Sequence, residues 1–164
     1  KLDTARLVGG FTSGGWLNLN NRQGRAVIHG LSINFVGVDD AHDGLDDLTI
    51  IPGKDELASG SDLVIGVSHA PYLRVIDAMS RAGVDVMFAG HTHGGQVCLP
   101  GFGALVTNCD LPRKNAKGIS SWANGGHTMI LNVTAGLGHS IFAPVRFFCR
   151  PEVRLLSLLP KATD

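Results

Sequence analysis

The segment from residue 62 to residue 90 constrains the fold more than any other part of the chain. DLVIGVSH, residues 62–69, is a short apolar run of the kind that forms a buried strand. VDVMFAG, residues 84–90, is a second such run. Between them lies PYLRVIDAMSRAG, in which a proline and a glycine flank apolar residues at helical spacing, namely Tyr72, Val75, Ile76 and Met79. The segment predicts a β-α-β unit with parallel strands.

Shorter apolar runs lie on both sides of this unit. RAVIHGLSINFVGV predicts a hairpin over about residues 25–38 that turns at His29-Gly30. Four later runs, separated by glycine and proline turns, also predict strands: QVCLP, ALVTN, HTMILNVTAG and VRLLSLLP, residues 96–100, 104–108, 127–136 and 153–160. The 22 glycines fit many short elements joined by tight turns. We expect a mixed α/β fold in which strands predominate.

Composition excludes some classes of function. Lys plus Arg and Asp plus Glu number 14 each, so the formal net charge is zero, which argues against a dedicated nucleic-acid or anionic-membrane binder. No signal peptide or membrane-length apolar run is evident, so we expect the chain as given to be soluble, and its location stays unknown. The widely spaced Cys98, Cys109 and Cys149 favour reduced thiols over a disulfide framework or zinc ribbon.

Histidines follow both strands of the β-α-β unit. His69 comes directly after the first strand, and His91 and His93 follow the second. In open α/β sheets, ligands bind just outside the carboxyl ends of the strands. Neutral imidazole is a common metal ligand, so three histidines at paired strand ends favour a metal site over ordinary loop residues. Gly94 and its glycine neighbours allow sharp turns and would leave space for a substrate.

These motifs resemble those of a known family. GHTHGGQ after one strand, with SHAP at the end of another, is similar to the calcineurin-like metallophosphoesterases, and specifically to a bacterial phosphodiesterase-like branch. From about residue 25 onward, further segments resemble that branch in its order: VGVDDAH, SHAPYLRVID, LPGFGALVTN, AKG and TAGLGHSIFAPVRFFCRPEVRLLSL.

The resemblance implies a fold and a chemistry. The fold would be the C-terminal half of a β-sandwich flanked by helices, with a strand-rich mixed sheet. His69 and His91 would bind one divalent metal and His93 a second, such as Mn, Fe or Zn. In the family, a hydroxide bridging the two ions attacks the phosphorus of a phosphodiester or phosphomonoester. The substrate would be a phosphate ester of a kind that the sequence leaves open.

The chain also departs from the family pattern. It lacks Gly-Asp-x-x-Asp and Gly-Asn-His, which supply a bridging carboxylate and the histidine that assists the leaving group, so no catalytic residue is assigned. Asp40-Ala41-His42 imitates the family's first motif, but it lies in VGVDDAH, a segment that belongs later in the family order. Asp40 and His42 are therefore candidates for second-shell or substrate contacts, as are Gly94 and, in TAGLGHS, His139.

These departures predict that residues 1–164 are a single partial domain, the C-terminal portion of a metallophosphoesterase domain. Alone, the chain would hold at most one weakly bound ion and would be inactive or nearly so. Surfaces left uncovered would favour self-association. Members of the branch often carry an N-terminal membrane anchor or an export signal, which would have been lost with the first half, so the sequence leaves the location of the intact protein open. Arg146, Arg150 and Arg154 alternate as on a strand, and we expect them on a solvated sheet face.

A second hypothesis belongs to another functional class. The chain would then be a non-catalytic module that retains the second half of the fold to bind a metal or a partner. The sequence upstream of Lys1 discriminates between the two hypotheses. Upstream Asp-x-His, Gly-Asp-x-x-Asp and Gly-Asn-His motifs would identify a truncated enzyme, whereas an initiating methionine next to Lys1 would favour the module. Because position 1 is not methionine, we expect that the chain is truncated or processed.

Overall fold

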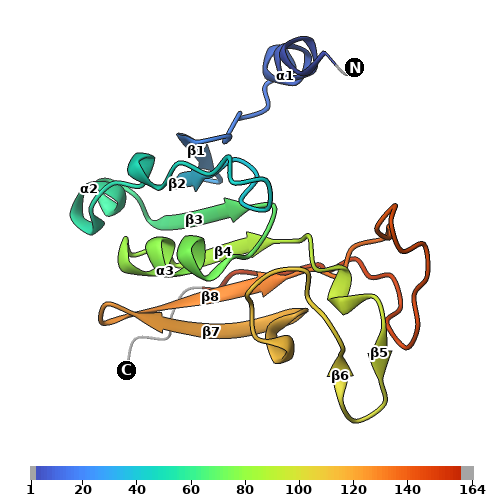
Figure 1. The fold of residues 1–164 in the computed structure, drawn as a ribbon. Coiled ribbons are helices and arrows are strands. Elements are labelled where there is room, and N and C mark those ends of the chain that lie inside the picture. The colour runs from blue at the N-terminus through green and yellow to red at the C-terminus, as the bar shows by residue number, and fades with distance from the viewer. Residues whose placement is uncertain (1–2, 160–164) are drawn as a thin grey trace.

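The predicted β-α-β unit forms the centre of a six-stranded mixed sheet (Figure 1). The computed structural model describes residues 3–159. Strands β3 (Leu63–Ser68) and β4 (Val86–Ala89) are parallel neighbours, and α3 (Leu73–Arg81) connects them. The sequence prediction of the α/β class, and of parallel strands here, is confirmed.

The remaining strands extend the sheet on both sides in the order β1-β2-β3-β4-β8-β7. β2 (Leu31–Gly37) lies parallel to β3, and β8 (His127–Val133) lies parallel to β4. Both edges are antiparallel, with β1 (Arg22–Ile28) on β2 and β7 (Gly118–Asn124) on β8. The hairpin of β1 and β2 confirms the prediction for residues 25–38, whereas β7 was not predicted.

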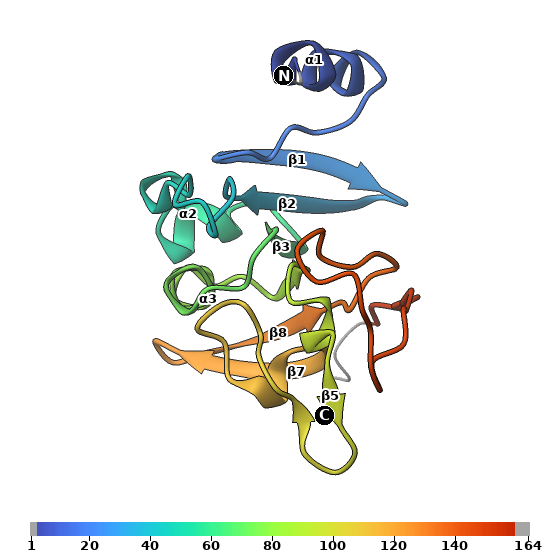
Figure 2. The ribbon, with the colours of Figure 1, turned by 45° about the vertical axis from the view of Figure 1, so that its right-hand side comes forward.

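Smaller elements lie around the sheet. Strands β5 (Cys98–Leu99) and β6 (Gly103–Ala104) form a two-stranded ribbon, and the helices besides α3 are α1 (Thr4–Ser13) and α2 (Lys54–Ala58). Three short 3-10 turns complete the set: η1 (Leu48–Ile50), η2 (His93–Gly95) and η3 (Arg113–Asn115). Figure 2 shows α1 beyond β1, at the opposite end of the molecule from the ribbon. No residue of α1 is buried.

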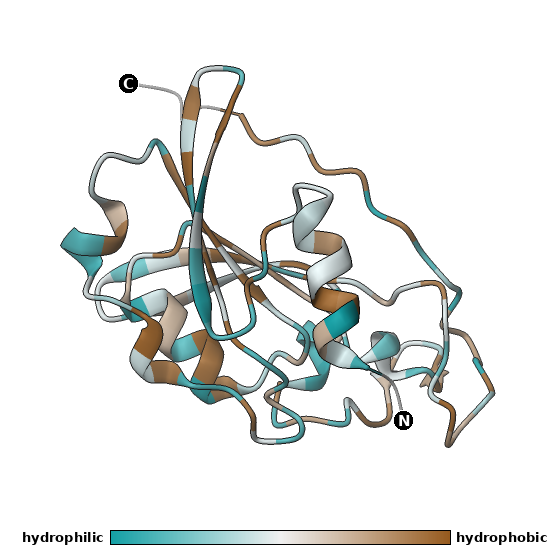
Figure 3. Cartoon of the chain, turned by 90° about the horizontal axis from the view of Figure 1, so that it is seen from above, coloured by the Kyte–Doolittle hydropathy of each residue, from teal (hydrophilic) through white to brown (hydrophobic). Residues whose placement is uncertain are grey.

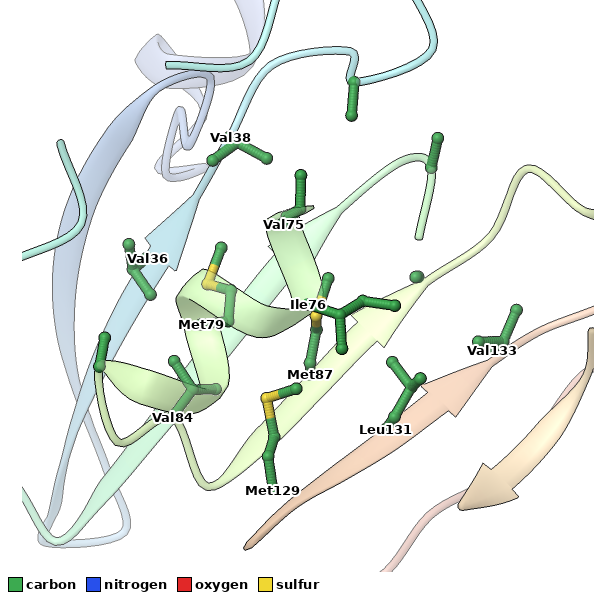
Figure 4. Packing of buried hydrophobic residues seen from close by; sticks show 14 of the residues in the cluster. Val36, Val38, Val75, Ile76, Met79, Val84, Met87, Met129, Leu131 and Val133 are labelled. Carbon is green, nitrogen blue, oxygen red and sulfur yellow. The ribbon is translucent and has the colours of Figure 1, made fainter. Parts of the chain in front are cut away.

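The hydrophobic core lies between α3 and one face of the sheet (Figure 4). Val75, Ile76 and Met79 of α3 are completely buried against this face. A Cβ added to Gly66 of β3 would lie 3.1 Å from Met79 Sδ, so glycine here allows the helix to approach closely. The apolar spacing of α3 thus accounts for its position on the sheet.

Polar contacts of Leu73 and Arg74 attach two neighbouring loops to the start of α3. The Leu73 N–H donates to the Asp110 carboxylate at 2.8 Å, which satisfies one free donor of the first helical turn. Arg74 pairs with Asp46 at 2.6 Å and donates to the Ala41 carbonyl at 2.7 Å. These contacts fix the two loops that approach the carboxyl ends of β3 and β4.

The other face of the sheet is apolar but less completely covered. Side chains alternate between the two faces of a strand, so a different set of residues lies on this face. Its larger apolar members are Ile33, Phe35, Leu63, Ile65, Val67, Val86, Phe88, Ile119 and Ile130. Within residues 3–159, the only sheet besides the main one is the small β5-β6 ribbon, so no second large sheet packs here.

Three predicted strands are shorter than expected or do not form. Only two residues of QVCLP are in a strand, and only Ala104 of ALVTN is. Residues 153–159 form neither helix nor strand, and Pro160 lies outside the described residues. Val153 and Leu155 are 76% and 96% exposed, and the chain that leads to the C-terminus is irregular (Figure 3). An apolar alternation without a pairing partner does not make a strand.

Residues 3–159 contain no helix that is long and apolar enough to cross a membrane.

Adjacent residues of β8 lie on opposite faces of the sheet, so substituting each of them tests which face α3 covers. Leu131 is fully buried under α3, whereas Ile130 on the opposite face is 44% exposed. Leu131→Ala should therefore lower the free energy of unfolding by about 2–5 kcal/mol, measured by urea titration. Ile130→Ala is the matched control and should cost less than half as much. Equal losses would contradict the assigned faces.

Candidate metal site at the strand ends

The register of β3 and β4 places His69 beside His91. Ser68, the last residue of β3, pairs with Ala89, the last residue of β4. Beyond this pair, the Gly90 N–H donates to the His69 carbonyl at 2.9 Å, which continues the strand contact by one residue. The His69 and His91 rings then meet edge to face, with centroids 5.1 Å apart. The predicted convergence of these two histidines is present.

His91 has the hydrogen bonds expected of an oriented metal ligand. Its Nε2 lies 3.1 Å from the Asn108 carbonyl oxygen, to which Nε2–H donates in one tautomer, and 3.3 Å from the Asn108 side-chain amide, which donates to Nε2 in the other. In the first tautomer the free lone pair is on Nδ1, which lies 3.2 Å from His69 Nε2. A ligating histidine usually donates its other N–H to a carbonyl or carboxylate in this way. Asn108 is thus a site residue that sequence reasoning missed: it ends the segment LPGFGALVTN, whose resemblance to the family assigned it no role.

His42 extends this pair of imidazoles. The His42 and His91 ring centroids are 4.5 Å apart, and His42 Nδ1 lies 2.9 Å from the Tyr72 hydroxyl. The Asp40 carboxylate accepts from the His42 backbone N–H at 2.9 Å. The structure therefore places both members of the Asp40-Ala41-His42 motif at the edge of the site. Their role as second-shell or substrate-contact groups remains a prediction.

Burial and neighbouring charges favour neutral imidazoles. Burial is the main cause that lowers the pKa of His91, and nearby His69 and His42 lower it further. Burial also lowers the pKa of His93, followed by the positive charge of Arg146 and then by His69 and His139. Because their pKa values are lowered, His91 and His93 are neutral at neutral pH. Neutral imidazole is the form that binds metals. The predicted role of His139 as a second-shell or substrate contact stays a prediction.

The backbone of GHTHGGQ is held in an uncommon conformation. His91, His93 and Gln96 have φ angles of 63°, 50° and 49°, and Asn108 opposite them has 58°. Non-glycine residues seldom adopt this left-handed region, and such strain concentrates at functional sites. A cluster of four such residues around one pair of histidines marks this corner as specialised.

Gly94 and Gly95 allow other parts of the chain to pack closely against this stretch. Gly94 and Gly95 are both buried. A Cβ on Gly94 would lie 2.7 Å from Cys149 Sγ, and one on Gly95 would lie 2.3 Å from Ala104 Cβ. The expected sharp turn is present, but the space above Gly94 is filled by the chain itself. Any contact between Gly94 and a substrate remains a prediction.

Two side chains to which the sequence analysis assigned no role in the site, Gln96 and Arg146, hold the C-terminal loop against it. The Gln96 amide donates to the Ala143 carbonyl at 2.6 Å and accepts from the Ser140 N–H. The Arg146 guanidinium donates to the His93 carbonyl at 3.1 Å and to the Ala135 carbonyl at 2.6 Å. The prediction that Arg146 lies on a solvated strand face is wrong, because its N–H groups point inward to carbonyl oxygens.

The residues fit a divalent ion in part. Two imidazole nitrogens bound to one zinc ion at the usual length are about 3.3 Å apart, close to the 3.2 Å between His69 Nε2 and His91 Nδ1. Among residues 3–159, however, no group of three or more His, Cys, Asp and Glu side chains is arranged to hold a metal. Two of the three predicted ligands, His69 and His91, lie side by side, but within residues 3–159 His93 does not complete a three-ligand group with them. The ligand role of each histidine stays a prediction.

The close packing of Gly95 gives a direct test of this corner. Gly95 and Gly101 have similar φ angles of 84° and 75°, but a Cβ on Gly101 would meet no atom within 4 Å. Gly95→Ala should lower the free energy of unfolding by about 1–3 kcal/mol more than Gly101→Ala, measured by thermal or urea unfolding. The His91 and His93 ring NMR signals should shift only in Gly95→Ala. Equal effects of the two substitutions would show that the corner is loosely packed.

Comparisons with known proteins give one similarity. No protein-family model and no solved structure matches the chain. Over 75 residues the chain is 35% identical to YkuE of Bacillus subtilis (strain 168), described as an uncharacterized metallophosphoesterase. The matched part is 46% of this chain and 24% of that relative, so it spans about a quarter of the relative's length. The chain is thus similar, over nearly half of its residues, to a protein named as a metallophosphoesterase.

Proposed function

We propose that this chain carries part of the metal site of a metal-dependent phosphoesterase, and that the longer protein to which it belongs hydrolyses a phosphodiester or phosphomonoester. The observation that carries the proposal is the His69–His91 pair, in which His91 is oriented by Asn108 and directs its second nitrogen toward His69. The 35% identity to a named metallophosphoesterase supports the same function.

Each histidine has a stated part in this proposal. His69 Nε2 and His91 Nδ1 would hold one ion, and His93 would contribute to a second ion in the longer protein. Mn, Fe, Zn or a similar divalent metal suits such nitrogen ligands. When bound, the ions would supply positive charge to the phosphoryl oxygens of a phosphate ester. The chain's own residues fix the imidazoles, through Asn108 for His91 and through Arg146 on the His93 carbonyl.

The same structure supports weak metal binding and little activity by this chain alone. Two neutral imidazoles provide no charge to balance a dication, and the bridging carboxylate of the family pattern is absent from the sequence. Asp40 lies at the edge of this corner, where one of its two carboxylate oxygens accepts from the His42 backbone N–H. We therefore infer that the chain binds at most one ion and that catalysis requires residues supplied by a longer chain.

A second candidate function is a non-catalytic metal-binding or partner-binding module. The lack of a three-ligand group among residues 3–159 favours the module, because a protein that kept the fold without a complete metal site would lack such a group. The strained backbone at His91 and His93 favours the enzyme, because a module without chemistry has no need of such strain. We rank the phosphoesterase first on that ground.

Self-association also belongs to the proposal. The sheet face opposite α3 carries large apolar side chains, and Ile119 and Ile130 on it are 57% and 44% exposed. A soluble protein rarely leaves such a face uncovered, so a second copy or a further part of the protein would cover it.

Metal binding by the chain tests the site. His91→Asn removes the imidazole, and asparagine tolerates the left-handed backbone of this position. The variant should bind zinc or nickel at least about tenfold more weakly than the unchanged chain in calorimetric titration, because a main ligand is lost. His29→Asn is the matched control, since His29 also has a left-handed backbone, with φ 52°, but lies in the β1-β2 turn. Equal affinity of the two variants would refute the assignment.

Turnover measurements test whether this chain is active alone or only as part of the longer protein. The purified 164-residue chain with added manganese should hydrolyse a generic aryl phosphodiester no faster than its His91→Asn variant does. A longer protein that contains the missing carboxylate motifs should hydrolyse the same compound, and His91→Asn should abolish that activity. Robust turnover by the 164-residue chain alone would overturn the inference that its site is incomplete.

A further inference from the structure

Two cysteines that are distant in the sequence lie together beneath the GHTHGGQ loop. Cys98 and Cys149 are both buried, and both thiols donate to the same acceptor, the Gly94 carbonyl oxygen, at 3.3 and 3.4 Å. The His93 carbonyl oxygen, 3.3 Å from Cys149 Sγ, is a second acceptor within reach of the single Cys149 thiol hydrogen. Burial raises the pKa of Cys98, and the neighbouring Cys149 thiol raises it further. The two sulfurs are therefore close neighbours and not isolated thiols.

The backbone around each cysteine keeps them together. Val97 and Phe147 form an isolated parallel bridge, in which the Cys98 N–H donates to the Phe147 carbonyl and the Phe147 N–H to the Gln96 carbonyl, both at 2.9 Å. This bridge fixes the segment after GHTHGGQ against the C-terminal loop.

A surface pocket provides access to Cys98. The pocket has a volume of about 400 Å³, and Cys98 and Phe148 are among the residues that line it. Three cationic residues, Arg113, Lys114 and Lys117, also line it, and no acidic residue does. A small anionic molecule would therefore be attracted to the pocket that contains the Cys98 side chain.

We propose that Cys98 and Cys149 are a redox-active thiol pair that small anionic disulfides, such as oxidised glutathione, convert to an intramolecular disulfide. The Cys98 thiolate attacks one sulfur of the small disulfide, its S–S bond breaks, and one small thiol leaves with a proton. The Cys149 thiolate then attacks Cys98 Sγ, the mixed disulfide breaks, and the second small thiol leaves with the second proton. The chain loses two electrons and two protons, and the small disulfide gains them.

Oxidation would change the contacts of the site loop. The thiol hydrogens that now bond to the Gly94 and His93 carbonyls would be lost, and a covalent link would join the C-terminal loop to β5. The proposal does not depend on phosphoesterase activity, because it follows from the positions of the two thiols and the pocket. Cys109 is an internal control, since it is the third free cysteine and packs elsewhere, against the main core.

The test uses the full reduced chain in its folded state. It is incubated with oxidised glutathione, all remaining thiols are alkylated, and the products are mapped by peptide mass spectrometry. We expect a Cys98–Cys149 cross-linked peptide and an alkylated Cys109. The melting temperature should rise by roughly 5–15 °C on oxidation and return on reduction, because a disulfide restricts the unfolded chain.

Three outcomes would overturn the proposal: all three cysteines alkylated after incubation, a glutathione adduct on Cys109 alone, or a cross-link that includes Cys109. Cys149→Ser adds a mechanistic check, because glutathione should then remain on Cys98 as a stable mixed disulfide. Cys109→Ser should leave the Cys98–Cys149 cross-link unchanged. The mapping of the unchanged chain decides the proposal even if the Cys149→Ser variant fails to fold.

Discussion

The parallel pairing of β3 with β4 is the constraint on which the site depends. Because Ser68 lies opposite Ala89, the next residues of the two strands bring His69 and His91 to the same point at the sheet edge. A slip of one residue would move every side chain of a strand to the other face. The packing of α3 on this face, with Met79 against Gly66, prevents such a slip. The core thus determines where the imidazoles meet.

Beyond the strand ends, hydrogen bonds to loop carbonyls replace strand pairing. Arg146 and Gln96 hold the C-terminal loop against the GHTHGGQ turn, and Asp110 ties another loop to the start of α3. These bonds maintain His91 and His93 in left-handed conformations that are unfavourable for residues with a Cβ. The strain and the restraining contacts occur together, as expected where imidazoles must be held in fixed directions. Cys98 and Cys149 lie under the same turn, so their oxidation state would act on it directly.

The sequence predicted those features that depend on local periodicity. The β-α-β unit, the hairpin and the meeting of His69 with His91 follow from apolar spacing and from the rule that parallel strands end at one edge. β7, which reads GISSWAN, was missed because its apolar residues are few, and it forms by pairing with β8. The contact of His42 with His91, and the inward direction of Arg146, depend on loops that approach from distant parts of the chain. No local pattern encodes such approaches.

The central claim is that His69 and His91 together hold a metal ion. X-ray absorption by zinc added to the chain at one equivalent measures the ligand atoms directly. The account predicts nitrogen ligands at about 2.0–2.1 Å, with the outer-shell scattering of at least two imidazole rings. The His91→Asn chain should lose part of that imidazole signal. Zinc surrounded by oxygen alone, or sulfur at about 2.3 Å from Cys98 and Cys149, would contradict the account.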